Sequence, residues 1–246
     1  MAGADGFWAR VARFRRTYQP SQGLFWIERV NFPAGALIAL LLLPTRVSPN
    51  AVTLSGLAAY LVGAVVVAFA NEPISIWVVI GVALTWQLAF SLDCADGSLA
   101  RARGTASPFG AWFDQLIDSI ARTAVYTAII AFLVRALELP ALASVVLSSL
   151  SVALALLQTF SSWQRAAVIG GPSPVDAAGG RGRALLSASR HLEDYGAFLF
   201  LAAVLLLVPT GLLAFMVGVA VVHALFVAAQ LALAWRRHAR ERRRAA

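Results

Sequence analysis

The chain has 246 residues, of which 60% are hydrophobic and only 13% charged, and its formal net charge is +8. This composition is too apolar for a soluble domain, which must cover its surface with polar side chains. The uncharged runs of about 20 residues exclude disordered, collagen-like and coiled-coil chains. All 20 basic residues are arginine, and they gather at the two ends and in connecting segments, which argues against nucleic acid as a partner. The composition therefore predicts a protein that crosses the membrane several times.

The N-terminal segment, residues 1–47, precedes the first clear span. Its first residues are basic but lack the apolar core and the small-residue cleavage site of a signal peptide. Residues 24–43 contain a short apolar run, yet their first half holds Glu28, Arg29 and Asn31. A span at this position would place the basic N-terminus outside the cell, against the positive-inside rule. We therefore expect residues 24–43 to form an amphipathic helix at the cytoplasmic interface.

Six apolar segments follow and make up a predicted membrane domain over residues 48–235. Two of them carry no charge over 20 positions, which is enough to cross a hydrocarbon layer of about 30 Å. The uncharged stretch 195–235 is too long for one helix, and Pro209 and Gly211 divide it. The predicted spans are 51–70, 73–92, about 109–134, 139–164 and the two halves of 195–235.

The arginines predict the orientation of this domain. If residues 51–70 begin inside the cell, the inner side receives the arginines of the N-terminal segment, of two loops and of the tail, whereas the outer side receives only Arg135. By the positive-inside rule, both termini lie in the cytoplasm. We therefore expect a multi-pass protein of the cell (inner) membrane with a basic cytoplasmic tail at residues 236–246.

Four aspartates lie in or beside the second and third predicted spans, where an unpaired carboxylate costs several kcal/mol. Two helices joined by a short inner connection are antiparallel neighbours, so polar stripes on both can face each other. Helical spacing predicts one such stripe on each of the two helices: Asp93, Asp96, Gly97, Ala100 and Arg101 on the first, and Gly110, Asp114, Asp118 and Arg122 on the second. Four carboxylates are therefore expected to converge near the cytoplasmic side.

A cluster of oxygen ligands suits a hard divalent cation. Mg²⁺ or Mn²⁺ fits better than zinc, because Cys94 is the only cysteine and the three histidines lie far along the chain. Cations beside Arg101 and Gly97 would form a receptor for a diphosphate. The pattern therefore predicts transfer at phosphorus.

Two other classes of protein could use intramembrane aspartates. An ion or proton transporter would need polar residues that continue through the outer half of the bundle, but residues 76–85 and 125–134 are almost wholly apolar. A membrane scaffold without activity, with aspartates that only pair with arginines, is the other alternative. The complete set of four aspartates argues against it.

One spacing in the chain resembles, at every fixed position, the signature of the CDP-alcohol phosphotransferase (CDP-alcohol phosphatidyltransferase) family: Asp93-x-x-Asp96-Gly97-x-x-Ala100-Arg101, eight residues, then Gly110-x-x-x-Asp114-x-x-x-Asp118. Residues 48–53 (SPNAVT) are also similar to the family's entry to its first span, although Asn50 as a simple helix cap is the alternative there. The resemblance implies six membrane helices after an interfacial helix, a CDP-alcohol donor, a hydroxyl acceptor and a homodimer.

The resemblance also implies residue roles and a reaction. Asp93, Asp96 and Asp114 would ligate two Mg²⁺ or Mn²⁺ ions, with Asp118 near the metals and acting as the general base. An acceptor hydroxyl would attack the β-phosphate, with CMP leaving. We expect CDP-diacylglycerol as donor in phospholipid synthesis, while a CDP-headgroup such as CDP-choline, CDP-ethanolamine or a CDP-polyol, used with a lipid or polyol acceptor, is the alternative. The residues expected to border the CDP group are Asp93, Asp96, Gly97, Ala100, Arg101 and Gly110.

Arg165 and Arg122 are further candidates for binding an anionic acceptor. Arg165 borders a predicted inner loop at 166–192, which is rich in Gly and Pro and long enough to cover a site. Loop arginines that face lipid phosphates are the simpler alternative. Arg122 lies one turn beyond Asp118, so pairing with that carboxylate competes with a substrate role. A structural or interfacial role is expected for His191, His223 and His238.

Overall fold

The computed structural model describes residues 6–19, 24–164 and 194–245, and all regular structure in these ranges is helical. This confirms the predicted all-α class. The elements in chain order are α1 (Phe7–Tyr18), the π-helical segment η1 (Ile27–Asn31), α2 (Phe32–Leu42), α3 (Pro49–Phe69), α4 (Ile76–Ala102), α5 (Pro108–Ala136), α6 (Ala141–Gln164), α9 (Tyr195–Leu205) and α10 (Pro209–Ala245).

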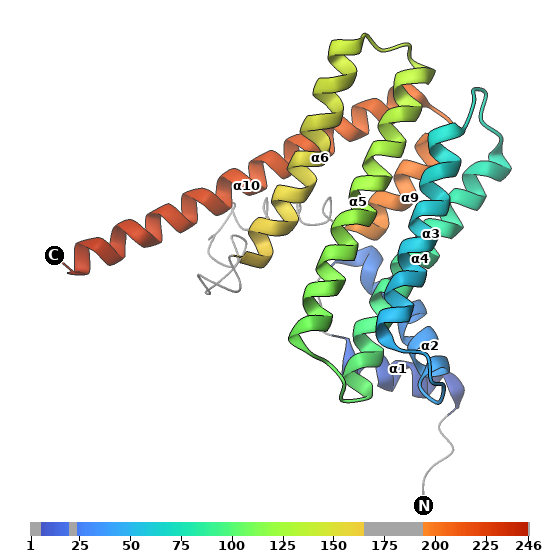
Figure 1. Ribbon diagram of the computed structural model, residues 1–246, viewed down its shortest axis with the longest axis vertical. Coiled ribbons are helices and arrows are strands. Elements are labelled where there is room, and N and C mark those ends of the chain that lie inside the picture. The colour runs from blue at the N-terminus through green and yellow to red at the C-terminus, as the bar shows by residue number, and fades with distance from the viewer. Residues whose placement is uncertain (1–5, 20–23, 165–193, 246) are drawn as a thin grey trace, which may run out of the picture.

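Helices α3, α4 and α5 form the centre of the bundle, with α3 packed against both of the others (Figure 1). Helix α9 packs against α4, and α6 packs against α5 and α10. The core between them is apolar and includes Trp86, Phe132 and Leu199. Large apolar side chains such as Val65 and Leu225 are exposed on outer faces, which is the arrangement of helices surrounded by lipid.

Among the described residues, four helices are long and apolar enough to cross a membrane, and α6 and α9 contain shorter apolar stretches, Ala141–Leu157 and Tyr195–Leu205. The predicted break within 195–235 is present, because α9 ends at Leu205 and α10 begins at Pro209. A membrane protein is thus confirmed at the level of four candidate spans, and the crossing of α6 and α9 stays a prediction. The four candidates are Pro49–Phe69, Ile76–Ala102, Pro108–Ala136 and Pro209–Arg236.

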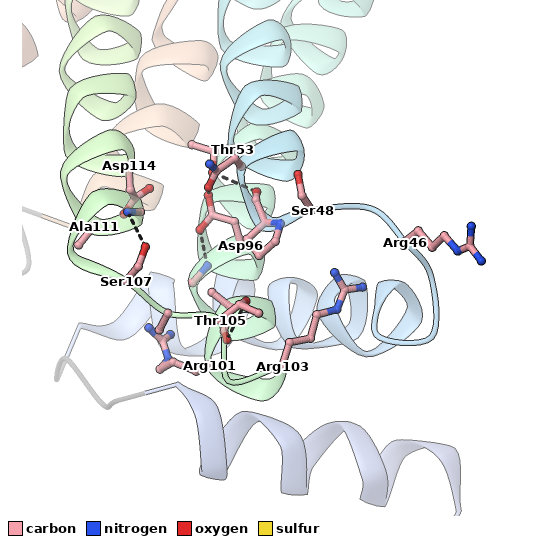
Figure 2. Close-up of a pocket in the computed structure, with 16 residues that line it drawn as sticks. Arg46, Ser48, Thr53, Asp96, Arg101, Arg103, Thr105, Ser107, Ala111 and Asp114 are labelled. Carbon is pink, nitrogen blue, oxygen red and sulfur yellow. Dashed lines mark hydrogen bonds between the residues drawn. The ribbon is translucent and has the colours of Figure 1, made fainter.

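Two helices cross the end of the bundle where α4 meets α5 (Figures 1 and 2). The first, α1, was not predicted from the sequence. It is amphipathic, since Val11 and Phe14 are buried while Arg10, Arg13 and Arg16 are exposed. The segment predicted over 24–43 is also helical, but the π-helical turns of η1 interrupt it in its polar half. Its second half, α2, is apolar on all sides rather than amphipathic, and its position at the interface stays a prediction.

Helix α2 is apolar on all sides and packs closely against α4. A Cβ atom added at Gly35 would lie 2.8 Å from Cβ of Cys94 and 2.9 Å from the carbonyl oxygen of Ser91. Only glycine allows the two backbones to approach this closely. Helix α2 is therefore seated beside the last turns of α4, which carry the predicted site.

Serine side chains determine where two of the central helices begin. The Ser48 hydroxyl accepts a hydrogen bond from the Ala51 N–H (3.2 Å), with Pro49 in the first turn of α3. The alternative in which Asn50 caps this helix is wrong, because Asn50 is already helical and Ser48 has the extended backbone of a cap. Ser107 begins α5 in the same way, by accepting from the Gly110 N–H (3.1 Å).

Substitution of Gly35 tests the close packing of α2 on α4. We expect Gly35→Ala to lower the free energy of unfolding by about 1–3 kcal/mol, because the new methyl group overlaps α4. Gly81→Ala is the matched control, since nothing lies within 4 Å of a Cβ at Gly81, and alanine favours the helix there. The measurement is thermal unfolding in detergent. Equal midpoints for the two variants would contradict the packing.

Candidate active site

The last turns of α4 and the first turns of α5 form the site. The turn between them contains Gly104, whose φ of +66° lies in the left-handed region that favours glycine. The Ser107 cap and Pro108 then start α5. This short connection turns the chain back, and acidic residues of the two polar stripes meet beside it, as the sequence predicted. The two helices were expected to be direct neighbours, but each packs mainly against α3 rather than against the other.

Three of the four predicted carboxylates converge. Ligand oxygens of Asp93, Asp96 and Asp114 all lie within 4.8 Å of one another. Asp118 lies one turn further into the bundle on α5, where its carboxyl group faces that of Asp93. Two helices that are otherwise apolar therefore bring their acidic side chains to one place.

Asp96 is held by two hydrogen bonds and is 4% exposed. The Thr53 hydroxyl on α3 donates to Oδ2 of Asp96 at 2.5 Å (Figure 2), and the Gly97 N–H donates to Oδ1. Helix α3 therefore contributes directly to the orientation of a predicted metal ligand. Thr53 is a site residue that the analysis of chemistry-bearing residues missed, although it is the last residue of the SPNAVT stretch.

The carboxylates border a cavity of about 530 Å³ between the ends of α3, α4 and α5 (Figure 2). Asp96 and Asp114 line this cavity, whereas Asp93 and Asp118 are not among its lining residues. Five of the six residues predicted to border the CDP group also line it: Asp96, Gly97, Ala100, Arg101 and Gly110. The start of α3 contributes the opposite wall, with Ser48, Pro49, Asn50 and Thr53.

Two arginines at this cavity bind backbone carbonyls. Arg101 donates from Nε to the Tyr18 carbonyl oxygen at the end of α1 (2.7 Å). Its guanidinium lies over Gly97, where a Cβ would be 3.2 Å from an Arg101 nitrogen. Arg103, which the sequence analysis did not single out, donates to the carbonyl oxygens of Leu42 (2.6 Å) and Val47 (2.5 Å), and also to that of Thr45 (2.9 Å).

The donor set at the carboxylate cluster fits a hard divalent cation. Oδ1 of Asp114 is buried and has no hydrogen-bond partner among the described residues. Three carboxylates within 4.8 Å repel one another, and a buried acceptor without a donor is costly. An oxygen-ligated ion such as Mg²⁺ or Mn²⁺ would remove both costs.

Arg122 lies beneath the carboxylates, one turn beyond Asp118 on α5. Its Cζ atom is 4.0 Å from the centroid of the Tyr195 ring on α9. It interacts electrostatically with Asp118. Pairing with this carboxylate was one of the two roles that the sequence suggested for Arg122, the other being substrate binding. Its Nε atom is buried without a hydrogen-bond partner in the described part of the chain.

The other sequence candidates lie elsewhere. Arg165, the loop 166–192 and His191 fall outside the described residues. His223 is buried, at 5% exposure, and His238 is exposed on the last turns of α10. Of the possible acceptor-binding residues, the structure therefore places only Arg122.

Carboxylates that could hold a divalent cation, beside a cavity lined by arginines, are groups that can bind and activate a phosphate ester. A protein-family model for CDP-alcohol phosphatidyltransferase matches residues 46–235. The match covers more than half of the chain, so the chain belongs to the CDP-alcohol phosphatidyltransferase family. No curated protein matches the chain.

Membership makes the chain a phosphotransferase, since members of this family transfer a phosphoryl-alcohol group from a CDP-alcohol and take part in phospholipid synthesis. The family generally depends on divalent metal. With the exception of Asp118, the residues that the sequence resemblance singled out either line the cavity or belong to the cluster of three carboxylates.

Loss of the Thr53 hydroxyl tests the support of Asp96. We expect Thr53→Val to raise the Mg²⁺ concentration for half-maximal CMP release by about 10- to 100-fold, because partners of metal ligands tune metal affinity by this amount. Thr53→Ser should restore most of the affinity. Thr85→Val is the matched control, since the Thr85 hydroxyl bonds only within α4, to the Gly81 carbonyl oxygen. An unchanged Mg²⁺ dependence in Thr53→Val would show that Asp96 needs no support from α3.

Proposed function

We propose that this protein transfers a phosphatidyl group from CDP-diacylglycerol to the hydroxyl of a small acceptor and releases CMP. The observation that carries the proposal is the convergence of Asp93, Asp96 and Asp114 within 4.8 Å at the inner end of a polar cavity. The cavity lies among helices that are long and apolar enough to span a membrane. A lipid-linked diphosphate can reach such a cavity while its acyl chains stay in the bilayer.

The CDP part of the donor would occupy the cavity. Gly97 and Gly110 have no side chains, so the diphosphate can approach the two helices closely. Arg101 has its Nε bound to the Tyr18 carbonyl, which leaves its terminal nitrogens to donate to phosphate oxygens. The four aspartates would bind two Mg²⁺ or Mn²⁺ ions, which supply charge neutralisation for the diphosphate and for the departing CMP.

The proposed reaction is a displacement at the β-phosphorus. The acceptor oxygen forms a bond to this phosphorus, and the bond from the phosphorus to the oxygen that bridges it to CMP breaks. The bridging oxygen keeps the bonding electrons and leaves as part of CMP, while the hydroxyl proton passes to the carboxylate of Asp118. Asp118 is suited to this role because it lies at the inner end of the cluster, next to Asp93, away from the cavity residues that face CDP.

The proposed placement in the membrane follows the charge distribution. Helices α1 and α2 would lie at the cytoplasmic surface. The six spans would be α3, α4, α5, α6, α9 and α10. Both termini and the cavity would face the cytoplasm. The amphipathic α1, with buried Val11 and Phe14 beneath exposed arginines, supports an interfacial position for this end of the bundle. The homodimer implied by the sequence resemblance stays a prediction.

Substitution of the aspartates tests the assigned chemistry. We expect Asp118→Asn and Asp93→Asn to lower the rate of CMP release by at least about 100-fold, because the first removes the base and the second a metal ligand. The assay uses purified protein in detergent with Mg²⁺, CDP-diacylglycerol or a CDP-headgroup, and a panel of hydroxyl acceptors. Thermal unfolding should show both variants folded, since each loses a repelling charge.

Glu72→Gln is the matched control for these variants, because Glu72 is an exposed carboxylate in the α3–α4 connection. It should retain the wild-type rate. If Asp118→Asn or Asp93→Asn also retained it, the assignment of the site would be refuted.

The basic tail tests the orientation. In sealed inside-out membrane vesicles, trypsin should remove an epitope tag fused after residue 246, because the arginines of residues 236–244 would face the protease. In right-side-out vesicles the tag should be protected. Cleavage only in right-side-out vesicles would place the termini outside the cell.

A further inference from the structure

The polar face of α5 does not end at Asp118. Arg122 follows on the same face, about 12 Å along the helix from Asp114. Polar groups from three other helices surround it: it interacts electrostatically with Tyr60 on α3 and with Tyr195 on α9, and His223 on α10 interacts with it in turn. A cation and several donors therefore lie together beneath the carboxylate cluster.

These groups lack partners within the described residues. The hydroxyl oxygens of Tyr60 and Tyr195, Nε of Arg122 and Nδ1 of His223 are all buried without a hydrogen bond. Tyr60 is 2% exposed, Tyr195 7% and His223 5%. Buried polar groups in folded proteins are almost always paired, and inside a membrane an unpaired group costs even more. Three such groups around an arginine whose own Nε is unpaired point to a polar ligand.

The geometry of the transfer indicates which ligand this is. In a displacement at phosphorus, the attacking and leaving oxygens lie roughly in line on opposite sides of the phosphorus. The leaving CMP belongs in the cavity on the side of Asp96 and Asp114. The attacking hydroxyl must then approach from the side of Asp93 and Asp118, and the next polar group in that direction is Arg122.

We infer that the polar groups around Arg122 bind the acceptor, and that the acceptor carries an anionic group, a phosphate or a carboxylate, in addition to its hydroxyl. The anionic group would bind the guanidinium of Arg122 and the hydroxyls of Tyr60 and Tyr195, while the acceptor hydroxyl lies at Asp118. This inference rests on the proposed transfer reaction and adds the substrate class of its acceptor side.

A small anionic acceptor also determines which substrate carries the lipid. The polar groups around Arg122 are bordered by aromatic rings that pack closely: the ring centroids of Tyr195 and Phe198 are 5.7 Å apart, and those of Phe90 and Tyr195 are 5.6 Å apart. A charged group of a few atoms suits such close surroundings better than a diacylglycerol. The acyl chains of the product must then come from the CDP-alcohol.

Matched acceptor pairs test the inference. The assay measures CMP release from CDP-diacylglycerol with sn-glycerol 3-phosphate against glycerol, and with inositol 1-phosphate against inositol. We expect wild type to prefer one anionic acceptor over its neutral counterpart. Arg122→Met should lower kcat/KM for that acceptor by about 10- to 100-fold, the loss expected for charge-assisted hydrogen bonds, and leave the KM for the donor unchanged.

Two further variants separate binding from folding. Tyr195→Phe keeps the ring on which Arg122 stacks and removes only the hydroxyl, so it should raise the KM for the anionic acceptor by about five-fold. Arg135→Met is the matched control: it removes an arginine from the far end of the same helix, where Arg135 bonds to the carbonyl oxygens of Ala131 and Ala70, and it should leave both KM values at the wild-type level.

A readout without turnover completes the test. The preferred anionic acceptor should raise the midpoint of thermal unfolding of wild type and of Arg135→Met, but not of Arg122→Met. The inference is overturned if Arg122→Met keeps this shift, if it impairs anionic and neutral acceptors equally, or if wild type uses only neutral acceptors such as diacylglycerol with CDP-choline. In the last case the reaction class still stands, whereas no CMP from any donor would refute the proposed function itself.

Discussion

Three carboxylates within 4.8 Å of one another, carried by helices that are otherwise apolar, are the constraint on which this structure depends. Lipid offers no water to separate such charges, so the protein must orient each carboxylate by its own contacts. Asp96 shows how: a hydroxyl from α3 and a backbone N–H bind its two oxygens. Close packing of α3 on α4 makes this contact possible, since a Cβ at Gly56 would lie 3.3 Å from the Ala89 carbonyl oxygen.

The arginines near the cavity give it positive charge, and their hydrogen bonds to backbone carbonyl oxygens also fix its shape. Arg103 gathers the carbonyl oxygens at the end of α2 and in the turn to α3, which are the orphan acceptors of a helix C-terminus. By fixing this turn, it positions Ser48 and the start of α3 at the cavity wall. Arg101 does the same for the end of α1. The cavity entrance thus depends on segments that lie before the membrane domain in the chain.

The sequence predicted the site better than it predicted the surroundings of the site. Helical spacing alone brings Asp93 and Asp96 to one face of α4 and Asp114 to the facing side of α5, because both helices are regular and the turn between them is short. The contact between Arg101 and Tyr18 joins residues 83 positions apart, and no local pattern predicts such a pairing. Helix α1 was missed because its apolar stripe is narrow and its arginines dominate the composition.

The surroundings of Arg122, on the inner side of the site, are held in place by other contacts than those that shape the cavity. The side chain of Asp194 is 1% exposed. Its carboxylate accepts hydrogen bonds from the N–H groups of Trp26 (2.7 Å) and Ile27 (3.2 Å) and also caps α9. Gln87 on α4 donates to the Gly196 carbonyl oxygen at 2.8 Å. These bonds fix the start of α9, and therefore Tyr195, against α4. The helices α1, α2 and α3 therefore shape the cavity, whereas α9 shapes the space around Arg122, so the proposed donor and acceptor sides of the site depend on separate sets of contacts.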